Sequence, residues 1–143
     1  MAHEKGLVNV LVSNGMATDQ IIRDIAPLID AANIDLKCFT DEGYRSLGGD
    51  LATVKRTIEL LAEMPTCHLE VTTLVVPSLS DDEAQIEAMA LWLASLDSSI
   101  PYHLTRFFPQ HRMTDVDPTP RATLARLKTI AERHLETVLL GNV

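Results

Sequence analysis

The sequence is poor in the features that mark several classes of protein. It has two cysteines, only 4% aromatic residues, and no apolar run near the ~20 residues that span a bilayer. Acidic residues outnumber basic ones by 20 to 12, so no basic face for nucleic acid is visible. Residues 1–5 are followed by no signal-peptide apolar region. We therefore expect a cytoplasmic protein without membrane or nucleic-acid partners.

Common catalytic motifs are also missing. The chain contains no GxGxxG, no Walker loop, no HExxH and no GxSxG. Cys38 and Cys67 lie far apart in unlike contexts, which favours reduced thiols over a disulfide. Nucleophilic catalysis through either thiol would need a nearby base that the sequence does not pick out. The remaining candidates are binding sites for a polar ligand.

What the chain does have is an alternation of short apolar segments with longer segments of helical period, typical of βα units on a mainly parallel sheet. At 143 residues and 46% hydrophobic composition, it can bury the core of one domain without disulfides. The predicted strands are residues 7–13, 32–37, 68–75, 102–107 and 137–140. The predicted helices carry apolar stripes over residues 21–29, 51–61, 86–96 and 124–131.

Local chemistry predicts where three of the helices begin. Asp50 is expected to cap the second helix. Ser80 and Glu83 have the spacing of a capping box for the third. Thr119 before Pro120 is a start signal for the fourth, because proline costs nothing at the first helical position.

The second predicted strand is unusual for a parallel sheet. In residues 33–37 polar and apolar side chains alternate, although a buried parallel strand is normally apolar on both faces. Asp35 and Lys37 share one face with attachment points roughly 6.6 Å apart, close enough to hold one zwitterionic ligand between them. The pattern allows an internal Asp35–Lys37 ion pair or a solvated edge strand as well.

Later strands repeat this arrangement. His68, Glu70 and Thr72 share a face of the third strand, and His103 and Thr105 share a face of the fourth. His68 lies at the amino end of the third strand, where we expect either a surface histidine or one whose hydrogen bonds are satisfied in the core. Glu70 lies deeper in the same strand. A lone histidine such as His103 is more often structural, yet it is a good hydrogen-bond partner for a ribose or a carboxylate.

The end of the first strand is a turn signal. Asn14 and Gly15 both tolerate positive φ, so a simple turn into the next helix explains them. A close approach of the backbone to a ligand is the functional alternative.

Five segments, taken in order, resemble the radical SAM enzymes. They are Val-Ser-Asn-Gly (12–15), Asn-Ile-Asp-Leu-Lys (33–37), Glu-Val-Thr-Thr-Leu-Val-Val-Pro-Ser-Leu-Ser-Asp (70–81), Pro-Tyr-His-Leu-Thr-Arg-Phe-Phe-Pro (101–109) and Gly-Asn-Val (141–143). The chain is most similar to the pyruvate formate-lyase activating enzyme-like group, and within it to the radical SAM member of the AmmeMemoRadiSam system. The resemblance implies an α/β fold, a partial (half) TIM-like barrel with about five mainly parallel strands and outer helices. Residues 1–143 would be one domain, the later part of that barrel.

The resemblance also implies a site. Intact members bind S-adenosylmethionine and a [4Fe–4S] cluster, but their CxxxCxxC loop does not occur in these residues, so we expect no metal ligands and no catalytic residue here. The matching positions imply that S-adenosylmethionine contacts six residues: Asn14, Asp35, Leu36, Lys37, Val76 and His103. Lys37 would pair with the ligand carboxylate, Asp35 and His103 would hydrogen-bond its polar atoms, and Val76 would form an apolar wall near the adenine.

Two functional hypotheses follow. In the first, the chain is the later half of a radical SAM enzyme whose intact form cleaves S-adenosylmethionine reductively to a 5′-deoxyadenosyl radical, and it is catalytically incomplete alone. In the second, it is a non-catalytic β/α module or remnant that acts by associating with another chain. Because an open five-stranded sheet leaves two strand edges, we expect self-association or a missing barrel half as partner.

Overall fold

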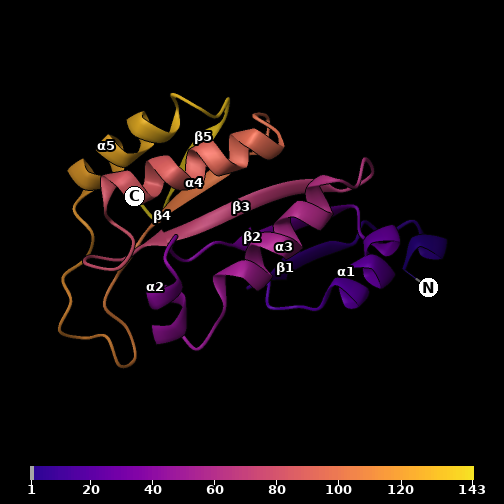
Figure 1. Cartoon of the computed structure of the whole chain (residues 1–143), viewed down its shortest axis with the longest axis horizontal. Coiled ribbons are helices and arrows are strands. Elements are labelled where there is room, and N and C mark those ends of the chain that lie inside the picture. The colour runs from indigo at the N-terminus through magenta and orange to yellow at the C-terminus, as the bar shows by residue number, and fades with distance from the viewer. Residues whose placement is uncertain (1) are drawn as a thin grey trace.

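The predicted strands form one parallel sheet in the computed structural model, which describes residues 2–143 (Figure 1). The strands are β1 (Val10–Ser13), β2 (Ala31–Asp35), β3 (His68–Val75), β4 (Tyr102–Arg106) and β5 (Val138–Gly141). Their spatial order is β1-β2-β3-β4-β5, and every neighbouring pair is parallel. Strand order thus follows chain order, as in the wall of a β/α barrel. The predicted α/β half-barrel architecture is confirmed.

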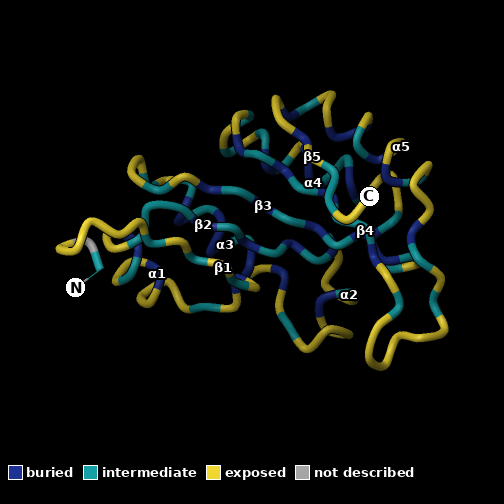
Figure 2. Tube along the Cα trace, turned by 180° about the vertical axis from the view of Figure 1, so that it is seen from behind, coloured by how far each residue is buried: buried dark blue, intermediate teal, exposed yellow. Residues whose placement is uncertain are grey.

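The helices cover one face of this sheet. They are α1 (Asp19–Ile25), α2 (Asp41–Ser46), α3 (Leu51–Ala62), α4 (Glu83–Leu96) and α5 (Arg121–Ala131), with short 3-10 turns η1 (His3–Lys5) and η2 (Ala26–Leu28). In Figure 1 helices α3 and α4 lie in front of the strands, and in Figure 2, seen from behind, the strands lie in front. The sheet therefore has a covered face and an open face.

The core lies between the covered face and the helices. Ile34, Val71 and Leu104 point from the strands into this layer and are fully buried, as are Leu61 and Ile86 from α3 and α4. Buried hydroxyl groups in the layer are satisfied as well. Among the residues that the structure describes, no buried side-chain nitrogen or oxygen lacks a hydrogen-bond partner. The open face is therefore free to be polar without weakening the core.

Predicted strand bounds are close to the observed ones. Residues 68–75 are confirmed as β3, whereas β1 begins three residues later than predicted and β2 ends at Asp35 rather than at residue 37. No helix in the described residues is long and apolar enough to cross a membrane. Both cysteines are free thiols. A cytoplasmic location stays a prediction.

The helix starts were predicted with mixed success. The Asp50 carboxylate accepts the Thr53 N–H at 2.8 Å and caps α3, as expected. The capping box was wrong, because the Ser80 hydroxyl is used at the end of β3 and Asp82 caps α4 instead. The start of α5 was one residue early: Pro120 occupies the cap position without a side-chain cap.

Candidate ligand-binding site

The open face of the sheet is polar at its centre. Side chains that point away from the helices include Asn33 and Asp35 from β2, Glu70 and Thr72 from β3, and His103 from β4, and all of them are half-buried. Residues adjacent to them in each strand are buried, and in residues 33–37 polar and apolar side chains alternate as predicted. The open face is thus the only side of the sheet on which these polar groups can meet a ligand.

Asp35 and Lys37 form an ion pair on this face. Lys37 Nζ lies 2.6 Å from Asp35 Oδ2, so the internal pair that the sequence allowed is present in the structure. The two side chains are nevertheless 33% and 37% exposed. A pair with this exposure is held weakly, because solvent competes for both charges. Lys37 is therefore available to a ligand carboxylate that approaches from the open side.

A cavity of about 210 Å³ lies beside this ion pair, at the carboxyl ends of β1 and β2. It brings together two of the residues that the resemblance pointed to, Asn14 and Lys37. The rest of its wall is Met16, Tyr44 and residues 47–49. The cavity therefore combines one cation and one amide with sulfur, aromatic and aliphatic surface, a combination that fits an amphipathic small molecule.

Tyr44 and the short helix α2 that carries it are the parts of this site that sequence reasoning missed. The Tyr44 hydroxyl accepts the backbone N–H of Lys37 at 3.0 Å and so holds the chain just beyond β2. Burial raises the pKa of Tyr44 to about 12, so the phenol stays protonated at neutral pH. The sequence did contain a signal for this helix, because threonine is a favoured N-cap residue. The Thr40 hydroxyl accepts the Gly43 N–H at 3.1 Å and caps the helix.

Glu70 is the centre of a second cluster on the open face. Its Oε2 lies 2.8 Å from His103 Nε2, and its Oε1 lies 3.1 Å from His68 Nε2. Asn33 Nδ2 approaches Oε2 at 3.4 Å, and the Thr72 hydroxyl donates to Asn33 Oδ1 at 2.8 Å. Burial raises the pKa of Glu70, but the hydrogen bonds from the two histidines outweigh it and the net pKa lies below its usual value.

His103 and Asp35 are aligned across the sheet. Asp35 pairs in register with Thr72, and Thr72 pairs with His103. Since neighbouring strands are about 4.8 Å apart, the two side chains stand roughly 10 Å apart on the open face. A ligand of nucleoside size that contacts both would lie across β3.

Leu36 and Val76 are not brought to this face. Leu36 is fully buried and its side chain lies in the core between sheet and helices, so a side-chain contact from the open face is ruled out. Val76 lies just beyond β3, is 6% exposed, and gives its backbone N–H to Ser80 Oγ. The apolar wall expected of Val76 is therefore mostly covered in this structure.

The thiols do not fit an iron–sulfur cluster. Cys38 follows β2 at the carboxyl end of the sheet and is buried, whereas Cys67 precedes β3 at the amino end. Burial raises the pKa of both thiols, which disfavours the thiolates that iron requires. Within residues 2–143 no group of three or more His, Cys, Asp or Glu is placed to hold a metal ion.

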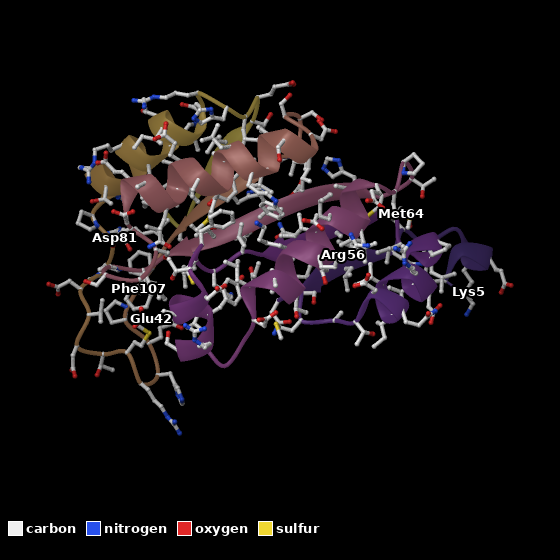
Figure 3. All side chains as sticks on the ribbon, in the orientation of Figure 1. Lys5, Glu42, Arg56, Met64, Asp81 and Phe107 are labelled. Carbon is white, nitrogen blue, oxygen red and sulfur yellow. The ribbon has the colours of Figure 1, made fainter. Side chains whose placement is uncertain are left out.

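A second cavity, of about 280 Å³, lies at the other end of the sheet. Met64, Cys67 and Pro101 are among its lining residues. In Figure 3 Met64 marks this amino end, and Phe107, which follows β4, marks the opposite end. Ligands of α/β sheets bind at the carboxyl ends of the strands. We therefore take the smaller cavity beside Lys37 as the candidate site.

Two solved structures share the fold of this chain. A crystal structure of a domain of pyruvate-formate lyase-activating enzyme from Bacteroides vulgatus matches with a TM-score of 0.83 over 98% of this chain and 84% of that domain, at 17% identity. A structure of TYW1 with a lysine-pyruvate adduct bound matches with a TM-score of 0.65 over 93% of this chain, at 17% identity.

One relative in sequence is the uncharacterized protein MJ0808 of Methanocaldococcus jannaschii, which is 32% identical over 145 residues. The match covers the whole of this chain and 43% of the length of that protein. This chain also covers 43% of the TYW1 structure. No family model matches the chain. The chain thus has the fold of a pyruvate-formate lyase-activating enzyme domain.

Proposed function

We propose that this chain is the S-adenosylmethionine-binding part of a radical SAM enzyme of the pyruvate formate-lyase activating type, within which the sequence favours the AmmeMemoRadiSam kind. The observation that carries the proposal is the cavity shared by Asn14 and Lys37, with Asp35 beside it and His103 on the same face. These four residues come from three separate segments that each resemble the family. The fold likeness to an activating-enzyme domain supports the same assignment.

Each residue has a distinct part in holding the ligand. Lys37 would exchange its ion pair with Asp35 for one with the ligand carboxylate. Asp35 would then accept a hydrogen bond from the ligand's ammonium group. His103, whose side chain stands roughly 10 Å from that of Asp35 across β3, would hydrogen-bond a different polar group of the ligand. When bound and reduced by one electron, S-adenosylmethionine supplies a 5′-deoxyadenosyl radical. The two thiols of this chain do not fit the cluster that delivers this electron, so we propose that the chain is catalytically incomplete alone.

Calorimetric titration of the 143-residue chain with S-adenosylmethionine tests this proposal. We expect saturable binding, and weaker binding of 5′-methylthioadenosine, which lacks the amino-acid end that Lys37 and Asp35 would hold. Equal affinity for the two compounds would place the ligand elsewhere. No saturable binding of S-adenosylmethionine would overturn the proposal.

A second candidate function is association with another polypeptide, which one observation favours. Val10 and Val12 on the edge strand β1 are 60% and 77% exposed, and both stand on or beside the open face. An exposed apolar edge strand invites strand pairing. Sedimentation at micromolar concentration should show self-association that Val12→Asp weakens and that Leu91→Asp, at an exposed position on α4, leaves unchanged. A monomeric wild-type chain would contradict this.

A further inference from the structure

Glu70 is a carboxylate on the open face that contacts two imidazole rings. His103 Nε2 lies 2.8 Å from one carboxylate oxygen, and His68 Nε2 lies 3.1 Å from the other. The Asn33 amide is fixed with its nitrogen toward the same carboxylate, because its oxygen accepts the Thr72 hydroxyl proton at 2.8 Å. Donors from β2, β3 and β4 thus converge on Glu70.

This arrangement determines which nitrogen of His103 carries the proton. An ionised carboxylate has only acceptor sites, so the ring nitrogen that faces it must be the donor. In the neutral ring Nε2 therefore holds the proton and Nδ1 keeps its lone pair. Among residues 2–143, which the structure describes, none is hydrogen-bonded to His103 Nδ1. The side chain is 23% exposed, so the ring is reachable from the open face.

We propose that Glu70 is a positioning residue that orients His103 and makes it a hydrogen-bond acceptor for a hydroxyl group of the ligand. The proposal rests on the proposed function, in which the ligand is S-adenosylmethionine, whose ribose carries two such hydroxyl groups. Glu70 itself lies behind His103 and does not need to touch the ligand. His68 takes the other oxygen of Glu70 and is largely exposed, so its share in orienting the carboxylate is smaller.

A double-mutant cycle separates this role from a merely structural one. Calorimetric affinities for S-adenosylmethionine are compared for the wild type, Glu70→Met, His103→Leu and the double variant. We expect each single change to weaken binding on the order of tenfold, the effect of losing one oriented hydrogen bond. The double variant should bind no more weakly than His103→Leu alone, because Glu70 acts through His103. Losses that simply multiply would overturn the proposal.

The chain offers a matched control pair on its outer layer. His134 Nε2 lies 3.3 Å from Glu87 Oε1, and the His134 side chain is 22% exposed, almost as His103 is. Glu87→Met removes the same kind of contact from helix α4 and should leave the affinity for S-adenosylmethionine unchanged. An equal loss of affinity in this variant would show that the effect of Glu70 is general and would refute its specific role.

Nuclear magnetic resonance of the wild-type chain tests the orientation without any ligand. The Nε2 proton of His103 should exchange slowly with water, because it is held by Glu70, and it should be lost in Glu70→Met. Glu70→Gln keeps an acceptor oxygen at the same place, so it should retain this proton and bind S-adenosylmethionine close to wild type even if Glu70→Met does not fold. Absence of the protected proton in the wild type would overturn the orientation. Failure of the wild type to bind S-adenosylmethionine would overturn the proposed function and the ligand role of His103. If the wild type binds but the affinity losses of the two single variants multiply in the double variant, only the role of Glu70 is overturned.

Discussion

Lys37→Met tests the candidate site at its centre. The change keeps the apolar stem of the side chain but removes the cation that lines the cavity and pairs with Asp35 at 2.6 Å. A charge-assisted hydrogen bond to the ligand carboxylate contributes roughly 1.5–3 kcal/mol. The affinity for S-adenosylmethionine should therefore fall by about 10- to 150-fold.

The same substitution should have little effect on folding. Because Lys37 and Asp35 are 37% and 33% exposed, solvent already competes for both charges. Ion pairs of this kind contribute about 0–1 kcal/mol to stability, and Asp35 stays hydrated when its partner is removed. A structural role for the pair predicts the opposite: a buried carboxylate left without its partner costs about 3–5 kcal/mol.

Calorimetric titration and urea unfolding of the same variant decide between these outcomes. Lys128→Met is the matched control, because Lys128 Nζ lies 3.4 Å from Glu132 Oε1 on α5 and its side chain is 34% exposed. This control should change neither affinity nor, by more than a fraction of a kcal/mol, stability. Unchanged affinity in Lys37→Met together with a loss of stability above about 3 kcal/mol would refute the assignment of Lys37 to the ligand site.

Three further predictions concern stability. The folded-state pKa of Glu70 lies below its usual 4.5, so the stability that its ionised form contributes is present above that pH and is lost as the pH falls through the folded-state value. The difference in urea midpoint between wild type and Glu70→Gln should therefore shrink as the pH is lowered from neutral through the folded-state pKa, and a constant difference would contradict this. Gly15→Ala should destabilise by about 1–2 kcal/mol or more, because Gly15 has a φ of +72° and an added Cβ would lie 2.9 Å from Ile34 Cγ2; thermal unfolding measures this, and an unchanged midpoint would contradict it. Thr57→Val should cost about 0.5–1.5 kcal/mol in urea unfolding, because the buried Thr57 hydroxyl donates to the Gly15 carbonyl at 2.8 Å and valine leaves that carbonyl with one donor, the Ala17 N–H at 2.9 Å; no loss of stability would refute this role of the hydroxyl.

Strand periodicity accounted for most of what could be predicted. Burial alternates along the eight residues of β3, and both its bounds and its two faces were as expected. The same rule, applied strictly, places Leu36 on the face opposite Asp35 and Lys37, where the structure has it. The family resemblance named Leu36 as part of a run of three residues, and alternation would have removed its side chain from the site.

Three features were not predicted, each for a different physical reason. The Ser80 hydroxyl has the correct spacing to cap α4, but the end of β3 lies within its reach and takes its hydrogen bonds. Helix α2 has six residues, so it carries no hydrophobic period to read. The contact between Glu70 and His103 needs the register that pairs Thr72 with His103, which exists only once β3 and β4 are paired in the sheet.

The open face carries residues that would serve each of the two proposed functions, ligand binding and association. Its centre holds charged and imidazole groups that already have partners, so covering it with apolar surface would leave Asp35 and Glu70 poorly solvated. Its margins are apolar: Val12 on β1 is 77% exposed and Leu139 on β5 is 45% exposed. A polypeptide that packed against these margins would bury apolar surface and leave room for a polar ligand over the centre. Ligand binding and association would therefore use different residues of one face, so both can occur in a single assembly.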